Sequence, residues 1–454
     1  MSILQRIRKI VVRRCPWEVH FNYETRGYNG VWSIIRFLFG VSELQYGRYV
    51  MEYQKAFAEL LGDNVVAYSF GAGRMALYAI LEACEIGEGD EVLVPAFTCE
   101  VVVHALMYRG IRPVYVDIDP NSFNIDCDSL IQRITSKARA IIAQHTFGIP
   151  CDMDRIRDIA VRHGLLVIED CALSLGANYK GRPVGTMGDA AIFSTDVTKV
   201  TSTVLGGMAV TTNPTISERL RYIYQQSPSP TKSQVLMILL QAIVSKVLLS
   251  PYLYYVGKYM MGVLRRMGIL YDYPEDKETF QRPVGYPCRM SNWQCFLGMD
   301  QLRALDRNLA LRRDTVKEYT SILNRKGIRL GWQAEGLSGP VLRFSLLLKD
   351  RQAVERRACG CIELGKWFDS PVQGWYEGLE RIGYCAGSCP SAEAVTRHVV
   401  NLPTHQTSPV IRRSLYRFLE SLEPADFASP GDLGSGSAGN RRSFSSGTMG
   451  NNKS

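Results

Sequence analysis

The sequence predicts an α/β protein with a mostly parallel central sheet that is covered by helices, followed by a smaller C-terminal α/β domain. Short, nearly continuous apolar segments alternate with amphipathic stretches from about residue 65 to residue 224. Strands of a parallel sheet have this composition, because helices bury both of its faces. The length of 454 residues indicates two domains with additional segments.

Seven apolar segments are predicted to form the strands of this sheet. They are residues 65–69, 91–95, 113–117, 138–144, 165–169, 190–194 and 208–212. Helical periodicity is clearest in residues 46–61, 74–84, 99–107, 127–134 and 153–163. Ligands of such sheets bind at the carboxyl ends of the strands, so the residues that follow each strand are the first candidates for a site.

Changes of composition divide the chain into five parts. We predict a basic lead-in at 1–45, a large cofactor-binding α/β domain at 46–224, an apolar helical insertion at 225–284, a small C-terminal domain at 285–422 and a disordered tail at 423–454. A long helix is expected to run from residue 289 to about residue 323. The tail is rich in Gly, Ser and Asn and has no apolar periodicity.

The insertion contains a run of thirteen uncharged residues, 233–245, and a second apolar run that crosses Pro251 after Lys246. A membrane-spanning helix needs about 20 consecutive apolar residues, so Lys246 and Pro251 argue against one. Helices packed on the fold or on a partner are the favoured interpretation, and an interfacial membrane helix is the alternative. A weak peripheral membrane contact through residues 233–256 is therefore predicted, and the basic segment 1–14 would suit it.

Charge and cysteine usage exclude several classes of protein. A net charge of +9 is modest at this length, and we expect no nucleic-acid partner. The twelve cysteines include no CxxC pair and no pair with histidines at zinc spacing, so we expect no metal site and free thiols in a reducing compartment. No secretory signal follows the basic N-terminus. The predicted localisation is cytoplasmic, with the inner membrane face as a peripheral alternative.

Three segments carry side chains that suit one cofactor. Asp170 ends an apolar strand, and Lys199 follows Ser194 and another strand ahead of Gly206-Gly207. A desolvated lysine is a nucleophilic amine for an aldehyde, and a carboxylate keeps a pyridine nitrogen protonated. A glycine turn enters a helix near Arg74, where helix N–H groups suit a phosphate. Each signal is weak alone, but their order is typical of pyridoxal-phosphate (PLP) enzymes.

The sequence resembles the DegT/StrS family of nucleotide-sugar aminotransferases over most of residues 47–224 and again over 285–405. The stretches that carry the resemblance include "GDEVLVPAFTCEVVVHAL", "HGLLVIEDCALSLGANYKGRPVGTMGDAAIFS", "GGMAVTT", "YPCRMSNWQCFLGMDQL" and "NLPTH". It implies the type I fold of PLP-dependent transferases and transfer of an amino group from glutamate to a nucleotide-linked keto-sugar. Polysaccharide, glycolipid or related amino-sugar biosynthesis is the implied setting. It also implies a homodimer, because the family's active sites lie between subunits.

The resemblance also implies individual roles by position. The family's catalytic Schiff-base lysine corresponds to Lys199, and the catalytic acid that holds the ring nitrogen corresponds to Asp170. Its phosphate-binding serine corresponds to Ser194, and its phosphate turn to Gly73-Arg74-Met75, where Arg74 replaces a small hydroxyl residue and would add a positive charge. A branch that deoxygenates sugars has a histidine in place of the lysine, so Lys199 argues against that branch.

Other positions depart from the family pattern. Leu173 replaces a glutamine that faces the ring hydroxyl, and Cys99 replaces an aromatic residue that often stacks on the ring, with Phe97 as a substitute. Pro287-Cys288 displaces an asparagine that a second subunit sends to the phosphate. The alternative to an enzyme is therefore a non-catalytic sugar-nucleotide-binding or membrane-associated family member that has lost turnover. His145 follows a strand and is either a pocket residue or, more commonly, a rim residue with satisfied hydrogen bonds.

Overall fold

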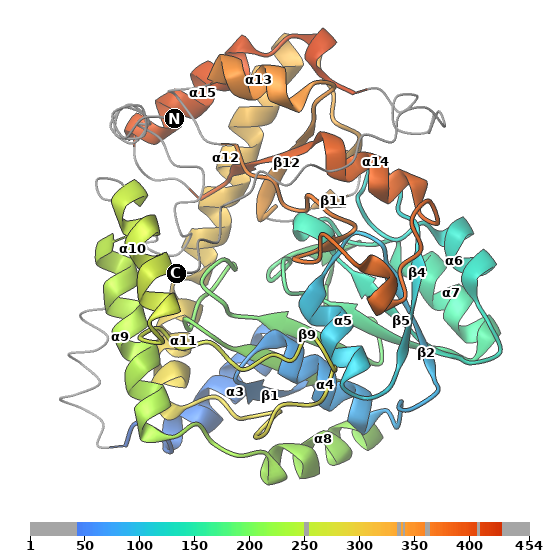
Figure 1. Cartoon of the computed structure of the whole chain (residues 1–454), viewed down its shortest axis with the longest axis vertical. Helices are drawn as coiled ribbons and strands as arrows, with labels where there is room; N and C mark the ends of the chain where they lie inside the picture. Colours follow the sequence, from blue (N-terminus) through green and yellow to red (C-terminus); the bar gives the residue numbers. More distant parts are fainter. Residues whose placement is uncertain are drawn as a thin grey trace, which may run out of the picture.

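The computed structural model describes residues 43–248, 254–333, 337–338, 341–358, 364–405 and 409–428 (Figure 1). The basic segment 1–14 and most of the lead-in therefore lie outside the described residues, as do residues 429–454 of the predicted tail.

The seven predicted strands form one sheet in the order β1-β10-β9-β6-β5-β2-β4. The strands are β1 (Val66–Phe70), β2 (Glu91–Pro95), β4 (Arg112–Val116), β5 (Ala138–Gln144), β6 (Leu166–Asp170), β9 (Ala190–Ser194) and β10 (Gly207–Thr211). In this sheet β10 runs antiparallel to both of its neighbours, and the other strands run in one direction. The predicted mostly parallel sheet is confirmed, and its central strands are almost wholly buried.

Helices cover the sheet as the apolar periodicity predicts. They are α3 (Arg48–Leu61), α4 (Gly73–Ala83), α5 (Glu100–Met107), α6 (Cys127–Arg133), α7 (Met153–His163) and α8 (Pro214–Gln226). Local capping sets several of the starts, because Asp126, Asp152 and Asn213 each accept hydrogen bonds from amides of the first turn. Helix α4 packs across β1, β10 and β9, so its N-terminus lies at the carboxyl end of β9.

The predicted single helix from residue 289 to residue 323 is wrong. Two helices occupy this segment, α11 (Asn292–Arg303) and α12 (Leu305–Arg325), and the chain turns between them at Ala304. Ser291 delays the start because its side chain and that of Gln294 form a reciprocal capping box. Apolar periodicity does not reveal the break, because both helices bury a face in the same core.

The C-terminal part contains the antiparallel pair β12 (Arg343–Leu347) and β14 (Val399–Pro403). The helices of this part are α13 (Arg351–Ala358), α14 (Pro390–His398) and α15 (Pro409–Ser421), with short 3-10 turns η2 (Gly331–Gln333) and η3 (Leu379–Ile382). Short strands join it to the large sheet's loops: β13 (Val372–Gln373) pairs with β3 (Thr98–Cys99), and β11 (Leu337–Ser338) pairs with β7 (Asn178–Tyr179), which pairs with β8 (Arg182–Pro183). The predicted domain boundaries remain predictions.

The start of the predicted tail is ordered. Residues 424–426 form the turn η4 (Pro424–Asp426), Asp426 makes an ion pair with Arg357, and the Ala428 amide donates to the Leu347 carbonyl at 3.0 Å. The prediction of disorder is therefore wrong for residues 423–428. Composition does not reveal this contact, because the partner of the Ala428 amide is a backbone carbonyl of β12, which lies far away in the sequence.

The insertion forms a helical hairpin, α9 (Lys232–Leu248) and α10 (Tyr254–Arg266), whose helices lie side by side at one edge of the molecule (Figure 1). Among the described residues, no helix is both long and apolar enough to cross a bilayer. The chain then passes residues 270–286 and returns to the sheet before α11.

Candidate active site

A cavity of about 250 Å³ lies where β6 and β9 end, beside the first turn of α4. Its lining brings together Gly73, Arg74, Asp170, Ser194 and Lys199. The remaining predicted site residue, Met75, is not in the lining: its side chain is buried in the core, and its amide donates to the Ala72 carbonyl at 3.1 Å. Five of the six predicted site residues therefore lie in the lining of one cavity at the strand ends, and their roles remain predictions.

Asp170 is the last residue of β6, between β5 and β9. Its side chain is buried, and Oδ1 accepts a hydrogen bond from the Ala172 amide at 2.9 Å. Burial raises the pKa of Asp170 above its ordinary value, although that hydrogen bond and the nearby positive charge of Lys199 act in the opposite direction. A cationic partner stabilises the charged form of a buried carboxylate. A protonated pyridine nitrogen is a partner of this kind.

Lys199 lies on the loop between β9 and β10, and its amide donates to the Asp196 carbonyl at 3.1 Å. Burial lowers the pKa of its amine below the ordinary lysine value, against the opposing effects of Asp196, Cys99 and Asp170. A lowered pKa increases the neutral fraction of the amine at a given pH. The environment of Lys199 therefore favours the neutral form of the amine, which is the form that attacks an aldehyde.

The first turn of α4 forms a cradle beside the cavity, with backbone N–H groups that lack an intrahelical acceptor. The amides of Met75 and Ala76 both bond to the Ala72 carbonyl, whereas the Gly73 and Arg74 amides come too early in the helix to have an intrahelical acceptor. A Cβ atom on Gly73 would lie 3.2 Å from Cβ of Ser194, so the serine faces this turn. The arrangement of two helix N–H groups and a hydroxyl fits a phosphate group.

The charged side chains around the cradle have partners of their own. Arg74 pairs with Glu275 at 2.7 Å, so the additional positive charge predicted at this turn is largely compensated. Two further carboxylates line the cavity: Asp272 pairs with Arg265 at 2.9 Å, and Asp196 accepts a hydrogen bond from the Thr198 amide at 3.2 Å. The groups of the cradle that remain available to a ligand are therefore the backbone N–H donors of α4 and the hydroxyl group of Ser194.

Two of the departures from the family pattern lie at the cavity. Cys99 and Leu173 line it, but the proposed substitute Phe97 does not; its ring is fully buried against Phe123, Phe147 and Phe368. Phe97 as a ring-stacking residue is therefore not supported by its position. Burial raises the pKa of the Cys99 thiol, which keeps it neutral.

The segment Pro287-Cys288 packs behind the glycine turn of its own chain. The Cys288 carbonyl accepts a hydrogen bond from the Gly71 amide at 2.9 Å, and a Cβ atom on Gly71 would lie 2.7 Å from the Cys288 sulfur. Where the family has an asparagine, this chain has Pro287-Cys288, which packs against the turn that precedes α4.

Sequence reasoning missed several lining residues. Trp367 and Phe368 come from the C-terminal part, Asp272 and Tyr273 from the insertion, and Gln144 from the end of β5. The rule about strand ends could have identified Gln144, whose amide nitrogen donates to the Phe97 carbonyl at 2.9 Å. The others had no local signal, because only tertiary packing brings them to the cavity.

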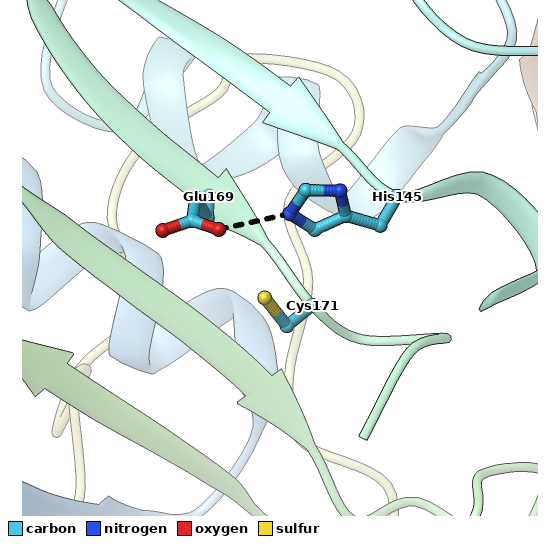
Figure 2. Close-up of side chains that lie close together, drawn as sticks. All are labelled: His145, Glu169 and Cys171. Atoms are coloured by element: carbon cyan, nitrogen blue, oxygen red, sulfur yellow. Dashed lines mark hydrogen bonds and ion pairs between the residues drawn. The ribbon is translucent and has the colours of Figure 1, made fainter. Parts of the chain in front are cut away.

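His145 belongs to a buried group with Glu169 and Cys171, outside the cavity lining (Figure 2). The Cys151 amide donates to Nδ1 at 3.0 Å, so the ring proton is on Nε2, which donates to Glu169 at 3.0 Å. Glu169 also accepts hydrogen bonds from the amides of Gly185, Met187 and Gly188. Burial raises the pKa of the Cys171 thiol well above its ordinary value. The ligand atoms are occupied or protonated, so we interpret the group as a structural brace.

Replacing His145 with alanine should destabilise the fold by about 3 kcal/mol, because a buried carboxylate loses its partner. Burial opposes ionisation of Glu169, but the hydrogen bonds from His145, Gly185 and Gly188 outweigh it and lower the pKa. This group therefore contributes stability above the ordinary glutamate pKa, and the contribution is lost as the pH falls through the lowered value. Urea unfolding at several pH values would measure it, with the exposed His163→Ala as control. Unchanged stability with lost activity would instead assign His145 to the pocket.

Glycine at position 207 is required by the close approach of β10 to α4. A Cβ atom there would lie 2.4 Å from the Gly73 nitrogen and 2.6 Å from the Ala72 carbonyl carbon. Gly207→Ala should therefore displace the cradle, weaken binding of PLP about tenfold or more and cost about 1–3 kcal/mol of stability. Gly262→Ala is the control, because its Cβ would meet nothing within 4 Å in α10. Fluorescence titration with PLP would measure the effect, and equal affinity of the two variants would contradict it.

The chain is similar in sequence to known aminotransferases. The sequence profile of the DegT/DnrJ/EryC1/StrS aminotransferase family matches residues 38–408. The GDP-perosamine synthase of Caulobacter vibrioides is 33% identical over 293 residues, which are 64% of this chain and 67% of that protein. The UDP-N-acetyl-3-dehydro-alpha-D-glucosamine 3-aminotransferase of Acidithiobacillus ferrooxidans is 41% identical over 167 residues, 36% of this chain and 45% of that protein. The chain thus spans about half to two thirds of the length of these relatives.

Solved structures share the fold. An aminotransferase from Psychrobacter cryohalolentis superposes with a TM-score of 0.68 at 23% identity, covering 87% of this chain and 96% of that one. A sugar aminotransferase of Streptococcus pneumoniae in its PLP form gives a TM-score of 0.67 at 21% identity, covering 86% and 95%. At these identities the likeness establishes the type I fold of PLP-dependent transferases.

Proposed function

Because this chain belongs to the DegT/DnrJ/EryC1/StrS aminotransferase family, we propose that it transfers an amino group from glutamate to a nucleotide-linked keto-sugar, with pyridoxal 5'-phosphate as cofactor. The observation that carries this proposal is the single cavity in which Lys199, Asp170, Ser194 and the start of α4 meet. These groups supply an amine, an anion and a phosphate cradle, which are the three needs of this cofactor.

Each residue has a role that follows from its surroundings. When bound, PLP supplies an aldehyde that reacts with amines and a ring that withdraws electrons from the substrate carbon. Asp170 would hold the ring-nitrogen proton, and Ser194 with the Gly73 and Arg74 amides would hold the phosphate. Lys199, the amine with a lowered pKa, would carry the aldehyde and then act as the base that moves the proton from the substrate α-carbon.

The substrate class rests on the relatives. Their names describe a GDP-sugar and a UDP-sugar product or substrate, which supports a nucleotide-linked sugar for this chain and a place in polysaccharide, glycolipid or related amino-sugar biosynthesis. Cys99 and Leu173 would change the contacts around a bound ring, whereas Lys199 and Asp170 remain in the cavity lining. The alternative of a non-catalytic binding protein therefore has no support from the two residues on which chemistry depends.

The test is an assay of the purified full chain with PLP, glutamate and a panel of GDP- and UDP-linked keto-sugars. We expect a yellow protein whose absorbance shifts on addition of glutamate, and an aminated sugar nucleotide detectable by mass spectrometry. A colourless protein that takes up no added PLP would overturn the proposal. A coloured protein that responds to glutamate and aminates no member of the panel would refute the substrate class alone.

We also propose a homodimer located in the cytoplasm. Family resemblance supports the dimer, because active sites of this family lie between subunits, and light scattering at micromolar concentration would detect it. The predicted weak membrane contact through residues 233–256 is part of the proposal and is independent of the chemistry in the cavity.

A further inference from the structure

The helical hairpin α9–α10 carries an unusual share of the exposed apolar side chains. Among the described residues, fifteen large hydrophobic side chains are exposed, and seven of them lie between residues 232 and 267. The seven are Leu236, Leu240, Val247, Val256, Tyr259, Met260 and Met267. Isolated exposed apolar residues are ordinary on a protein surface, but a concentration of this kind marks an interaction surface.

The exposed side chains follow helical periodicity. On α9, Val235, Ile238 and Ala242 are buried against the protein, whereas Leu236, Leu240 and Val247 recur at spacings of four and seven and form a separate exposed stripe. On α10, Val256, Tyr259 and Met260 recur at spacings of three and one, and thus share a face. The two stripes belong to one unit, because Gly257 packs directly against the Leu248 carbonyl.

Helix α10 buries little of itself against the protein. Of its residues whose side chains are described, only Gly257 is buried. An isolated helix of 13 residues is marginal in water, and most helices are stabilised by packing an apolar face. The apolar face of α10 therefore lacks the contact surface that such a helix normally has, and a further surface would stabilise it.

The charge of the hairpin indicates which kind of partner surface it binds. Residues 219–271 contain seven Lys or Arg and no Asp or Glu, although the chain has 44 acidic residues in 454. Five of these cations lie in the two helices: Lys232, Lys246, Lys258, Arg265 and Arg266. Arg265 pairs with Asp272, but a second copy of the hairpin would still bring the remaining cations of the two copies together, which is repulsive. An anionic lipid surface offers negative charge and an apolar layer together.

We propose that the α9–α10 hairpin, residues 232–248 and 254–267, binds the surface of an anionic lipid bilayer. The hairpin lies in the interface, with the exposed apolar stripes in the upper acyl region and the long Lys and Arg side chains extending to the headgroups. This agrees with the absence, among the described residues, of a helix able to cross the bilayer. The segment after α10 leads directly to the cavity, because Arg265 pairs with the cavity residue Asp272 at 2.9 Å.

The test is flotation of the full chain with vesicles of phosphatidylcholine alone or of equimolar phosphatidylcholine and phosphatidylglycerol. We expect the chain to bind the anionic vesicles about tenfold or more better than the neutral ones, and raised salt to weaken the binding. A hairpin variant carries Leu236→Ser, Leu240→Ser, Tyr259→Ser and Met260→Ser, all at exposed positions. It should lose about tenfold or more of the binding. The matched control, Ile131→Ser with Val161→Ser, removes exposed apolar side chains from α6 and α7 and should bind as the parent does.

A charge variant separates the electrostatic contribution to vesicle binding from the apolar contribution. Lys258→Gln with Arg266→Gln should reduce binding to anionic vesicles by about fivefold per cation while leaving the weak binding to neutral vesicles unchanged. Arg265 is kept, because its ion pair belongs to the cavity wall. Thermal unfolding midpoints equal to that of the parent show that the variants are folded.

Three outcomes would overturn the inference. The parent chain could fail to bind anionic vesicles, it could show no preference for them, or the four-serine variant could float as the parent does. A variant that loses only self-association, measured by light scattering, would assign the hairpin to a contact between copies of the chain. The inference rests on the membrane contact in the proposed function and specifies its lipid. None of these readouts depends on transaminase activity, so failure of the inference and failure of the proposed amino transfer are distinguishable.

Discussion

Replacing Lys199 with alanine should remove the covalent attachment of the cofactor and reduce transamination by at least about 10²–10⁴-fold, the range that loss of a positioned base alone produces. The reason is local: this lysine lines the cavity, its amine has a lowered pKa, and it lies on a loop between two core strands. Lys199→Arg should lose activity to a similar extent, because a guanidinium keeps the charge but is not a nucleophile at neutral pH.

Mass spectrometry after borohydride reduction would measure this prediction. The parent chain should carry a reduced PLP adduct on the peptide that contains Lys199, and neither variant should carry one there. Lys137→Ala is the matched control, since Lys137 is an exposed lysine and lies outside the cavity lining. An adduct on another lysine of the parent chain, or unimpaired turnover by the alanine variant, would contradict the assignment.

The lowered pKa of Lys199 also predicts a pH dependence. Covalent capture of PLP requires the neutral amine, so its rate should rise with pH and level off at a lower pH than an ordinary lysine would require. Stopped-flow absorbance of apoprotein mixed with PLP would follow this rate. A rate that continues to rise up to the ordinary lysine pKa would show that the amine is not desolvated in solution.

Replacing Asp170 with asparagine should reduce turnover by about 10²–10⁴-fold, which corresponds to breaking a buried ion pair at about 3–5 kcal/mol. Asparagine has the same shape and retains an oxygen that can accept the hydrogen bond from the Ala172 amide. It cannot compensate a protonated ring nitrogen, so the loss should appear mainly in kcat. The exposed Asp158→Asn on α7 is the control.

Stability of the apoprotein distinguishes this role from a structural one. The pKa of Asp170 is raised in the folded protein, so the folded state binds the proton more tightly than the unfolded state. Its stabilising contribution is present below the ordinary aspartate pKa and is lost as the pH rises through the raised value. At neutral pH the Asp170→Asn apoprotein should therefore be at least as stable as the parent apoprotein, whereas the PLP-loaded variant should be less stable than the PLP-loaded parent. Thermal unfolding of both forms would measure this, and a destabilised Asp170→Asn apoprotein would indicate a structural carboxylate.

Local features of the sequence determined the sheet and pointed to five residues that line the cavity. Each strand appeared as a short apolar segment within one or two residues of its observed bounds, for example at 91–95 and 138–144. Asp170 lies at the end of such a strand and Lys199 follows one, and position relative to a strand end is a property of the nearby chain. The glycine turn before Arg74 was identifiable for the same reason. The role of Ser194 came from the family resemblance.

Tertiary structure alone decided the features that depend on distant segments. Trp367 and Phe368 reach the cavity through the pairing of β13 with β3, and Phe97 turns away from it into an aromatic cluster. The charge of Arg74 is compensated by Glu275, which lies 201 positions later. The ordered start of the tail depends on β12 in the same way. Apolar periodicity and turn residues report the conformation of neighbouring residues, whereas these contacts arise from packing between segments that approach one another only when the chain is folded.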